Sequence, residues 1–255
     1  MKARCAEIEK LKLASMERYY QQRRFSVLKT ILNYVLGHIQ MGGKCLTILD
    51  LGSGQGMALD IIASFLARGF LIGVDLSRPN AEVLKQKGYS VVVADVEYLP
   101  FRSTIADMVL LCEVIEHLPQ PDGVLFEIQR TLRKNGHLIL STPNRYGIYE
   151  YKEIVFWGYK PHEIVNSLRN KPRSYYPFHI RLYSIKELRN LIKKHGFVME
   201  EWFSCGFCFP FLGNVAVIGR LGRYDIFNSK LLIRILRFFE KIWIFNLNLI
   251  LHCRN

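Results

Sequence analysis

Short apolar runs alternate with stretches of helical periodicity between Cys45 and residue 203. Continuous apolar runs of strand length indicate strands buried on both faces, and helical stretches between them are typical of βαβ units. The runs predict six strands: Leu46–Leu51, Phe70–Asp75, Ser90–Ala94, Met108–Cys112, His137–Thr142 and Phe197–Phe203. The stretches between them predict four helices: Met57–Ala67, Pro79–Gln86, Gly123–Leu132 and Ser184–His195. We therefore expect an α/β fold with a doubly wound, mostly parallel sheet.

The N-terminal part of the chain differs from this repeat. Residues Ile8–Ile39 carry apolar side chains at helical spacing and contain no glycine or proline before Gly37, which predicts N-terminal helices within residues 1–43. A chain of 255 residues has the length of one large domain. We expect a single domain over residues 1–255, with its core at residues 44–204.

The C-terminal part is apolar and basic. Residues 205–243 predict a cap or insertion, in which the amphipathic pattern of Lys230–Trp243 resembles a helix at a membrane surface. Packing of this insertion onto the domain is the alternative. Asn246–His252 has strand length, so residues 244–255 predict a seventh and last strand. No apolar run reaches the roughly 20 residues that a membrane span needs.

The charge of the chain favours contact with anionic partners. The formal net charge is +13 and half of the residues are apolar, which suits nucleic acid, acidic lipid or a phosphorylated substrate without choosing among them. The six cysteines are scattered and no secretory apolar segment follows Met1, so we expect a cytoplasmic protein, with Cys205 and Cys208 as buried thiols.

A glycine-rich turn follows the first predicted strand. The sequence LDLGSGQG carries Gly52, Gly54 and Gly56, which let the backbone turn tightly and let a ligand approach it. The dinucleotide fingerprint has a third glycine where this chain has Met57, which argues against NAD. About 20 residues later Asp75 ends the second strand, where a carboxylate can accept hydrogen bonds from both ribose hydroxyls. Together these features predict a ligand that contains ribose.

Several ordered motifs resemble those of the Rossmann-like S-adenosyl-L-methionine-dependent methyltransferases. They are LDLGSGQG, GVDLS, ADVEYLPF, ADMVLLCEVIEHL and LRKNGHLILSTPN, and the later FHIRLYSIKELRNLIKKHGF extends the resemblance to about Phe203. The resemblance implies a seven-stranded Rossmann-like methyltransferase fold with S-adenosyl-L-methionine as the cofactor. The closest branch by motif is that of the ubiquinone-biosynthesis O-methyltransferases.

The resemblance also implies roles for single residues. Asp50 and the glycine turn would surround the methionine part of the cofactor, Asp75 would hold the ribose, Asp95 would accept from the adenine amino group, and Glu113 would lie near the sulfonium. The predicted cofactor-binding residues are Asp50, Gly52, Ser53, Gly54, Gly56, Asp75, Leu76, Asp95, Val96 and Glu113. The acids fall at carboxyl ends of strands, where ligands bind in open α/β sheets, and carboxylates suit a cationic sulfonium.

The sequence EVIEH after the fourth strand predicts either a metal site or a general base. It resembles the motif with which small-RNA terminal-ribose methyltransferases and ubiquinone-biosynthesis O-methyltransferases hold a divalent cation. Glu113, Glu116, His117 and the later His179 would then bind magnesium or zinc and activate an acceptor hydroxyl. Without metal, His117 or His179 would be the catalytic base. We expect no function for His162.

The acceptor is left open by the sequence. Aromatic and basic residues alternate between Tyr146 and Tyr183, which predicts an acceptor lid or an ordinary cap. No Asn-Pro-Pro-Tyr-type sequence follows the fourth strand, so oxygen acceptors are favoured over amino groups. A hydrophobic small molecule or lipid precursor is the first choice, with peripheral membrane contact, and an RNA terminus is the second. The rival classes are a non-catalytic cofactor-binding protein and an NAD-dependent oxidoreductase.

Overall fold

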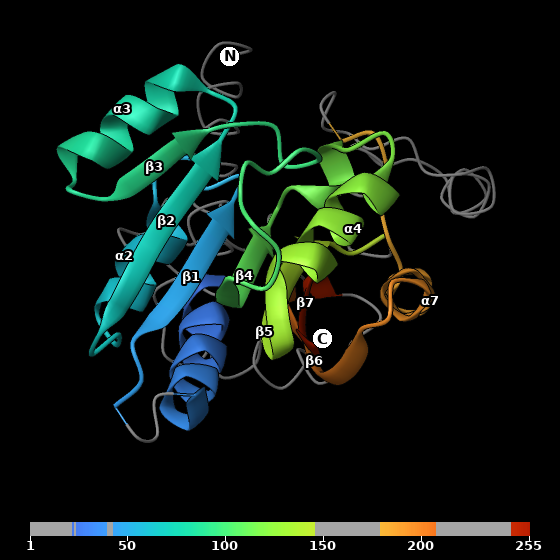
Figure 1. Cartoon of the computed structure of the whole chain (residues 1–255). Helices are drawn as coiled ribbons and strands as arrows, with labels where there is room; N and C mark the ends of the chain where they lie inside the picture. Colours follow the sequence, from blue (N-terminus) through green and yellow to red (C-terminus); the bar gives the residue numbers. More distant parts are fainter. Residues whose placement is uncertain (1–21, 23, 40–42, 146–178, 208–245) are drawn as a thin grey trace, which may run out of the picture. The chain divides into compact units, whose positions relative to one another are not determined.

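The computed structural model describes residues 22, 24–39, 43–145, 179–207 and 246–255 (Figure 1). The chain divides into two compact units. The unit formed by Leu28–Pro143, Phe178–Phe203 and Leu249–Asn255 contains most of the described residues. The predictions for the lid at 146–178, for His162 and for the helix at Lys230–Trp243 lie outside the described residues. The single domain over residues 1–255 stays a prediction.

The described elements confirm the predicted strands and helices. The strands are β1 (Leu46–Leu51), β2 (Gly69–Asp75), β3 (Ser90–Val93), β4 (Ala106–Cys112), β5 (Leu132–Pro143), β6 (Val198–Phe207) and β7 (Asn246–Arg254). The helices are α2 (Met57–Ala63), α3 (Arg78–Gln86), α4 (Pro121–Thr131) and α7 (Ile185–Lys194), with a short 3-10 helix η1 (Ile115–His117). A further helix occupies residues 24–39.

One sheet joins all seven strands in the order β3-β2-β1-β4-β5-β7-β6. The pairs β1–β2, β1–β4, β2–β3 and β4–β5 are parallel. The last residue, Asn255, exchanges backbone hydrogen bonds with Asn135 and Gly136, so the end of β7 lies beside the start of β5 and the two strands run in opposite directions. This arrangement confirms the predicted doubly wound, mostly parallel α/β sheet.

Several predicted boundaries differ from the observed ones, and three of the differences have a local physical reason. Strand β5 begins at Leu132 rather than at His137, because its first residues include exposed polar side chains that give no apolar signal. Helix α4 begins at Pro121 rather than Gly123, as expected for proline at a first helical position. Helix α2 ends at Ala63 rather than Ala67, because the hydroxyl of Ser64 donates to the Ile61 carbonyl oxygen and closes the helix.

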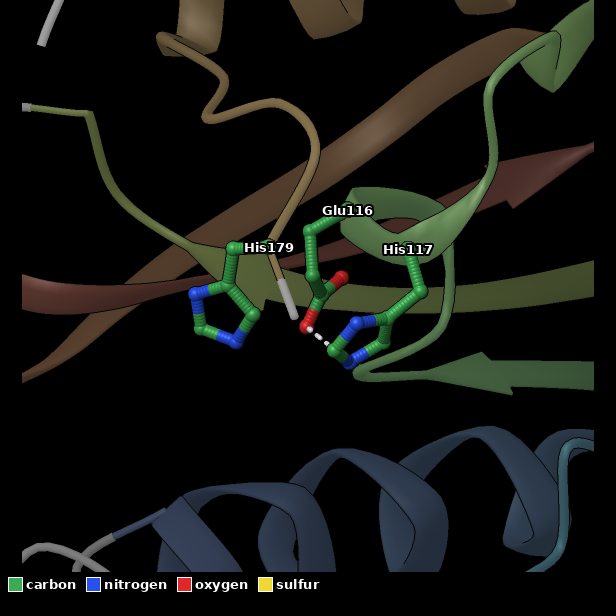
Figure 2. A group of neighbouring side chains, drawn as sticks. All are labelled: Glu116, His117 and His179. Carbon is green, nitrogen blue, oxygen red and sulfur yellow. Dashed lines mark ion pairs between the residues drawn. The ribbon is translucent and has the colours of Figure 1, made fainter. Parts of the chain in front are cut away.

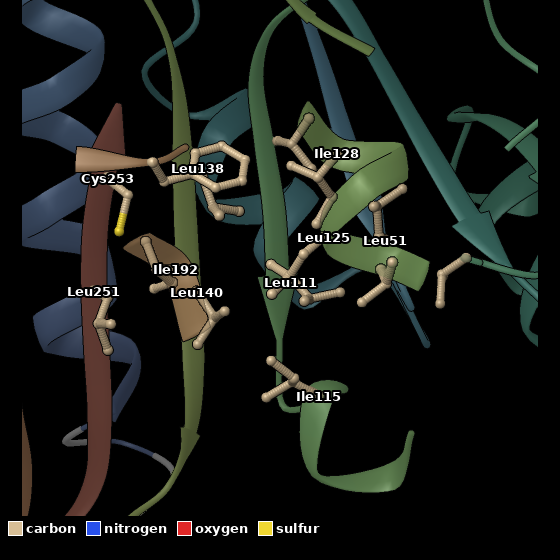
Figure 3. Close-up of a cluster of buried hydrophobic side chains, with 14 of the residues drawn as sticks. Leu51, Leu111, Ile115, Leu125, Ile128, Leu138, Leu140, Ile192, Leu251 and Cys253 are labelled. Carbon is tan, nitrogen blue, oxygen red and sulfur yellow. The ribbon is translucent and has the colours of Figure 1, made fainter. Parts of the chain in front are cut away.

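The core fills both sides of the sheet with aliphatic side chains. Figure 3 shows Leu111 of β4 and Leu140 of β5 beside Ile128 of α4 and Ile192 of α7, and all four are at most 1% exposed. Helix 24–39 buries one face, formed by Leu28, Ile31, Leu32, Val35 and Leu36. This spacing of three and four residues is typical of an amphipathic helix, and it confirms the N-terminal helical prediction for these residues.

Helix α7 begins and ends as its sequence predicts. Ser184 is the N-cap residue and forms a capping box with Glu187, and Gly196 follows the helix with φ +80°. The helix therefore fixes where the preceding segment, which contains His179, enters the fold. Among the described residues, no helix is both long enough and apolar enough to cross a membrane.

The turn between β1 and α2 depends on glycine. Gly56 is the N-cap residue of α2 with φ +82°, and a Cβ atom there would lie 2.5 Å from Cδ2 of the fully buried Leu84. Any other residue would combine an unfavourable left-handed backbone with a steric clash.

We predict that Gly56→Ala lowers the free energy of unfolding by about 2–4 kcal/mol, the sum of left-handed backbone strain and overpacking. The matched control is Gly88→Ala, since Gly88 has φ +84° and a Cβ atom there would meet nothing within 4 Å. It should lose only about 1–2 kcal/mol. Urea unfolding of both variants measures the difference, and equal losses would contradict the assigned clash with Leu84.

Candidate active site

Four acidic side chains follow four neighbouring parallel strands at their carboxyl ends. Asp50 lies near the end of β1, Asp75 ends β2, Asp95 follows β3 and Glu113 follows β4. Because β1 pairs with both β2 and β4, the strand order reverses at β1, and the crevice at such a switch point is where open α/β sheets bind ligands. The acids predicted from the sequence thus belong to one edge of one sheet.

Asp75 is held rigidly by three donors. Its Oδ2 accepts from the backbone N–H of Gly54 at 2.7 Å, and its Oδ1 accepts from the backbone N–H of Ser77 at 2.8 Å and from Nδ2 of Asn80 at 3.2 Å. The carboxylate joins the glycine turn to the start of α3. Ser77 and Asn80 were not predicted as site residues, although the sequence LSRPN directly after Asp75 carries the signal of a helix N-terminus.

Asp50 is a buried carboxylate with an unsatisfied oxygen. The residue is 2% exposed, and its Oδ2 has no hydrogen-bond partner in the structure. Burial, and to a smaller extent the charge of Asp75, raise the pKa of Asp50 to about 7. A buried acceptor without a donor is unfavourable in the free protein, so its presence points to a ligand that supplies a donor or a positive charge.

The glycine turn allows the loops after β1 and β4 to approach closely. A Cβ atom on Gly52 would lie 2.4 Å from Cγ2 of Val114, so only glycine fits against the β4 loop. A Cβ atom on Gly54, in contrast, would meet nothing within 4 Å. The first glycine therefore packs the two loops together, and the second leaves room beside Asp75.

The remaining predicted cofactor residues have different surroundings. Ser53 is buried and its hydroxyl donates to the carbonyl oxygen of Val74 at 3.4 Å, which ties the turn to β2. Leu76 is 71% exposed, which makes its apolar surface available to a ligand. The Oδ1 atom of Asp95 accepts from the N–H of Glu97 at 3.0 Å, and Val96 is buried.

Glu113 adopts a strained backbone conformation at the end of β4. Its φ is +57°, which is uncommon outside glycine, and such conformations are concentrated at functional sites. Its N–H donates to the carbonyl oxygen of Ser141, and its Oε1 accepts from the hydroxyl of Ser141 at 2.7 Å. Ser141, on β5, therefore fixes the carboxylate, a role that the sequence analysis did not assign.

Glu116, His117 and His179 form a second group of polar side chains (Figure 2). One possible ligand atom from each lies within 4.8 Å of the others. The imidazole centres are 5.0 Å apart, and Nε2 of His117 lies 3.9 Å from Oε1 of Glu116. Glu113 is not a member of this group, so the structure brings together three of the four predicted metal ligands.

Backbone hydrogen bonds bring His179 to this group. The carbonyl oxygen of Glu116 accepts from the N–H groups of Ile180 and Arg181 at 2.8 and 3.1 Å, and Oε2 of Glu116 accepts from the Thr142 hydroxyl at 3.0 Å. Glu116 is fully buried, whereas the side chain of His117 is 40% exposed. The sequence analysis did not predict Thr142 as a site residue. Its place near the carboxyl end of β5 was the one feature of the sequence that could have indicated this role.

The residues present fit S-adenosyl-L-methionine. The unsatisfied oxygen of Asp50 is a suitable partner for a cationic group, and Asp75 is a fixed acceptor at the end of β2 that could bind ribose hydroxyls. A Cβ atom on Gly54 would meet nothing within 4 Å, so there is open space next to this residue. The neighbouring imidazoles of His117 and His179 are groups that can remove a proton from an acceptor or hold a divalent cation.

Comparison with known proteins agrees with this geometry. Residues 49–140 match the family model described as a methyltransferase domain. A probable S-adenosylmethionine-dependent methyltransferase of Mycolicibacterium smegmatis is 29% identical over 156 residues, which is 60% of this chain and 52% of the relative. A ubiquinone biosynthesis O-methyltransferase of Neisseria meningitidis is 30% identical over 125 residues, or 45% of this chain and 50% of the relative.

The chain thus spans about half the length of these curated relatives. Among solved structures, a SAM-dependent methyltransferase from Archaeoglobus fulgidus matches with a TM-score of 0.56 at 18% sequence identity. The match covers 89% of this chain and 94% of the chain from Archaeoglobus fulgidus. This likeness supports the fold. Together with the matched domain and the confirmed sheet order, it shows a Rossmann-like fold with a methyltransferase domain over residues 49–140.

Proposed function

We propose that this protein transfers a methyl group from S-adenosyl-L-methionine to a hydroxyl of a hydrophobic small molecule or lipid precursor. One observation carries the proposal: acidic residues lie at or just after the carboxyl ends of β1, β2, β3 and β4, and the one on β1 has a buried oxygen without a partner. This set of acceptors suits a ligand with a ribose and positive charges, whereas the phosphates of a dinucleotide would need donors.

Each acid has a distinct binding role in this proposal. Asp75 accepts hydrogen bonds from the ribose hydroxyls while its present donors hold the carboxylate still. Asp50 faces the positively charged methionine part, and Asp95 accepts from the adenine amino group. Glu113, held by Ser141, lies near the sulfonium. The sulfonium supplies an activated methyl group, and the residues contribute mainly by positioning the acceptor in line with it.

One of two imidazoles, that of His117 or that of His179, removes the acceptor proton. Their side chains lie close together beyond β4, and His117 is partly exposed, so a hydroxyl can approach. With a bound divalent cation, Glu116, His117 and His179 would be the ligands, and the cation would lower the pKa of the acceptor hydroxyl. Glu113 then serves the cofactor rather than the metal, because Ser141 holds it outside this group.

The choice of acceptor is supported by the O-methyltransferase relative and by the basic, apolar composition. An RNA terminus is the second candidate, since the net charge of +13 suits a phosphate backbone. A non-catalytic cofactor-binding protein remains the rival without turnover. Contact with a membrane surface stays a prediction for Lys230–Trp243.

We predict that S-adenosylhomocysteine binds in calorimetric titration, that NADH does not, and that Asp75→Asn weakens binding about 10- to 100-fold. Loss of one or two hydrogen bonds to a charged acceptor has this magnitude. The control is Asp60→Asn, which removes an exposed acid that contacts Lys87 and Tyr89 outside the strand ends. Unchanged affinity in a folded Asp75→Asn protein would remove the ribose assignment.

We predict that the protein transfers a methyl group from radiolabelled S-adenosylmethionine to a prenylated quinol. The rate of transfer should fall at least tenfold in His179→Asn and stay unchanged in His195→Asn. His195 is a suitable control because its imidazole contacts Asp122 instead. A chelator should abolish the transfer if the cation is required, and addition of magnesium or zinc should restore it.

The same assay separates the acceptor classes. RNA as the acceptor would give transfer that falls steeply with salt, because phosphate contacts release counterions. Full activity in both the chelated enzyme and His179→Asn would exclude metal assistance and the assigned base. Cofactor binding without transfer to quinol, lipid or RNA would favour the non-catalytic rival.

We predict that Asp50→Asn stabilises the ligand-free protein at neutral pH. The pKa of Asp50 is raised from 3.8 to about 7 in the folded protein, so the acid favours folding when protonated, and this contribution is lost as the pH rises from about 4 to 7. The variant should therefore match the wild type below pH 4 and gain up to about 4 kcal/mol above pH 7.

Urea unfolding between pH 3.5 and 8 measures this gain. Asp60→Asn is a control for which the opposite change in stability is expected. Burial alone would raise the pKa of Asp60, but hydrogen bonds from Lys87 and Tyr89 lower it below its usual value. The Asp60→Asn protein should therefore be less stable than the wild type at neutral pH. A pH-independent effect of Asp50→Asn would contradict the assigned ionisation.

A further inference from the structure

A second group of possible metal ligands lies outside the candidate active site. It consists of His137 on β5, Glu200 on β6 and His252 on β7, and one ligand atom from each lies within 4.8 Å of the others. Since the sheet order is β5-β7-β6, the three residues come from three adjacent strands. No feature of the proposed methyl transfer uses them.

These residues lie at the opposite edge of the sheet from the acids. His137 pairs with Met108, which is near the start of β4, whereas Glu113 and Glu116 come after the end of that strand. Nearby, Asn255 is tied by backbone hydrogen bonds to Asn135 and Gly136, at the start of β5. Binding at this edge is therefore separate from cofactor binding.

The two imidazoles are directed at each other. Nδ1 of His137 lies 2.8 Å from Nε2 of His252, and the rings are stacked with an interplanar angle of 19°. In the absence of an ion this distance requires a proton between the two nitrogens. Glu200 lies on the far side, with Oε2 3.7 Å from Nδ1 of His252, and favours the tautomer that carries its proton on Nδ1. The Nε2 lone pair of His252 then points at His137.

The protonation state of the imidazoles suits a metal ion. Burial, together with the charges of His252 and Arg254, lowers the pKa of His137 to about 4, and burial lowers the pKa of His252. Both shifts favour the neutral form of the rings, which is the form that binds metals. The guanidinium of Arg254 contacts Oε1 of Glu200, so the carboxylate is oriented and Oε2 is left for another partner.

We propose that His137, His252 and Glu200 bind one zinc-like divalent ion that joins β5, β7 and β6. Two imidazoles and one carboxylate favour zinc, nickel or copper over magnesium or calcium. In tetrahedral zinc sites two nitrogen ligands lie roughly 3.3 Å apart, so the imidazoles need to separate by about half an ångström. The shared proton moves to Nε2 of His137 when the ion binds, and Glu200 turns toward the ion.

The test compares two double variants of the full chain. After removal of metal with a chelator, the wild type, His137→Asn/His252→Asn and His117→Asn/His179→Asn are titrated with Co²⁺, read by visible absorption, and with Zn²⁺ against a chromophoric chelator. We expect the first variant to lose one ion equivalent that the second retains. Zn²⁺ should also raise the melting temperature of the second variant, in which His117 and His179 no longer provide ligands.

A milder variant guards against misfolding. Glu200→Gln keeps both imidazoles and should bind Zn²⁺ at least tenfold more weakly than the wild type, while circular dichroism shows the same secondary structure. The proposal is overturned if His137→Asn/His252→Asn retains the full stoichiometry and affinity of the wild type. It is also overturned if the wild type and the His117→Asn/His179→Asn protein bind no Zn²⁺ at micromolar concentration, since the imidazoles would then share only a proton.

Discussion

The position of β1 between β2 and β4 is the constraint on which the rest of the structure depends. Parallel pairing on both sides buries five of the six residues of this strand. The strands that come next in the chain lie first on one side of β1 and then on the other. The ends of β1 and β4 then stand next to each other, and the loops that follow them meet. Gly52 permits that meeting, because any side chain there would collide with Val114.

The carboxyl edge of the sheet carries several unfavourable local features. Asp50 is buried with an unsatisfied oxygen, and Glu113 has a left-handed backbone. Fixed partners hold the other groups: three donors fix Asp75, and hydroxyls on β5 hold Glu113 and Glu116. Such a combination of strain and fixed polar groups is typical of sites that bind a ligand, since the ligand supplies the missing interactions.

The other edge of the sheet is tied together by the C-terminal strand. Asp107, at the start of β4, contacts Lys44, Arg133 and the N–H of Thr47, and Asn255 closes the sheet beside β5. The imidazoles of His137 and His252 add a contact between two strands that are far apart in the sequence. One edge therefore stabilises the fold and the other is arranged for chemistry.

The sequence by itself determined the elements and the acids at the strand ends. Apolar runs such as Leu46–Leu51 and the glycine turn are local signals, because burial of a strand and tight turns depend on neighbouring residues. The start of β5 was missed since polar side chains there hide the strand. Only the tertiary structure decided that Ser141 holds Glu113, that Glu113 lies outside the group of Glu116, His117 and His179, and that His137 meets His252. Those contacts join residues 28 to 115 positions apart in the chain, and side-chain periodicity carries no information about such distances.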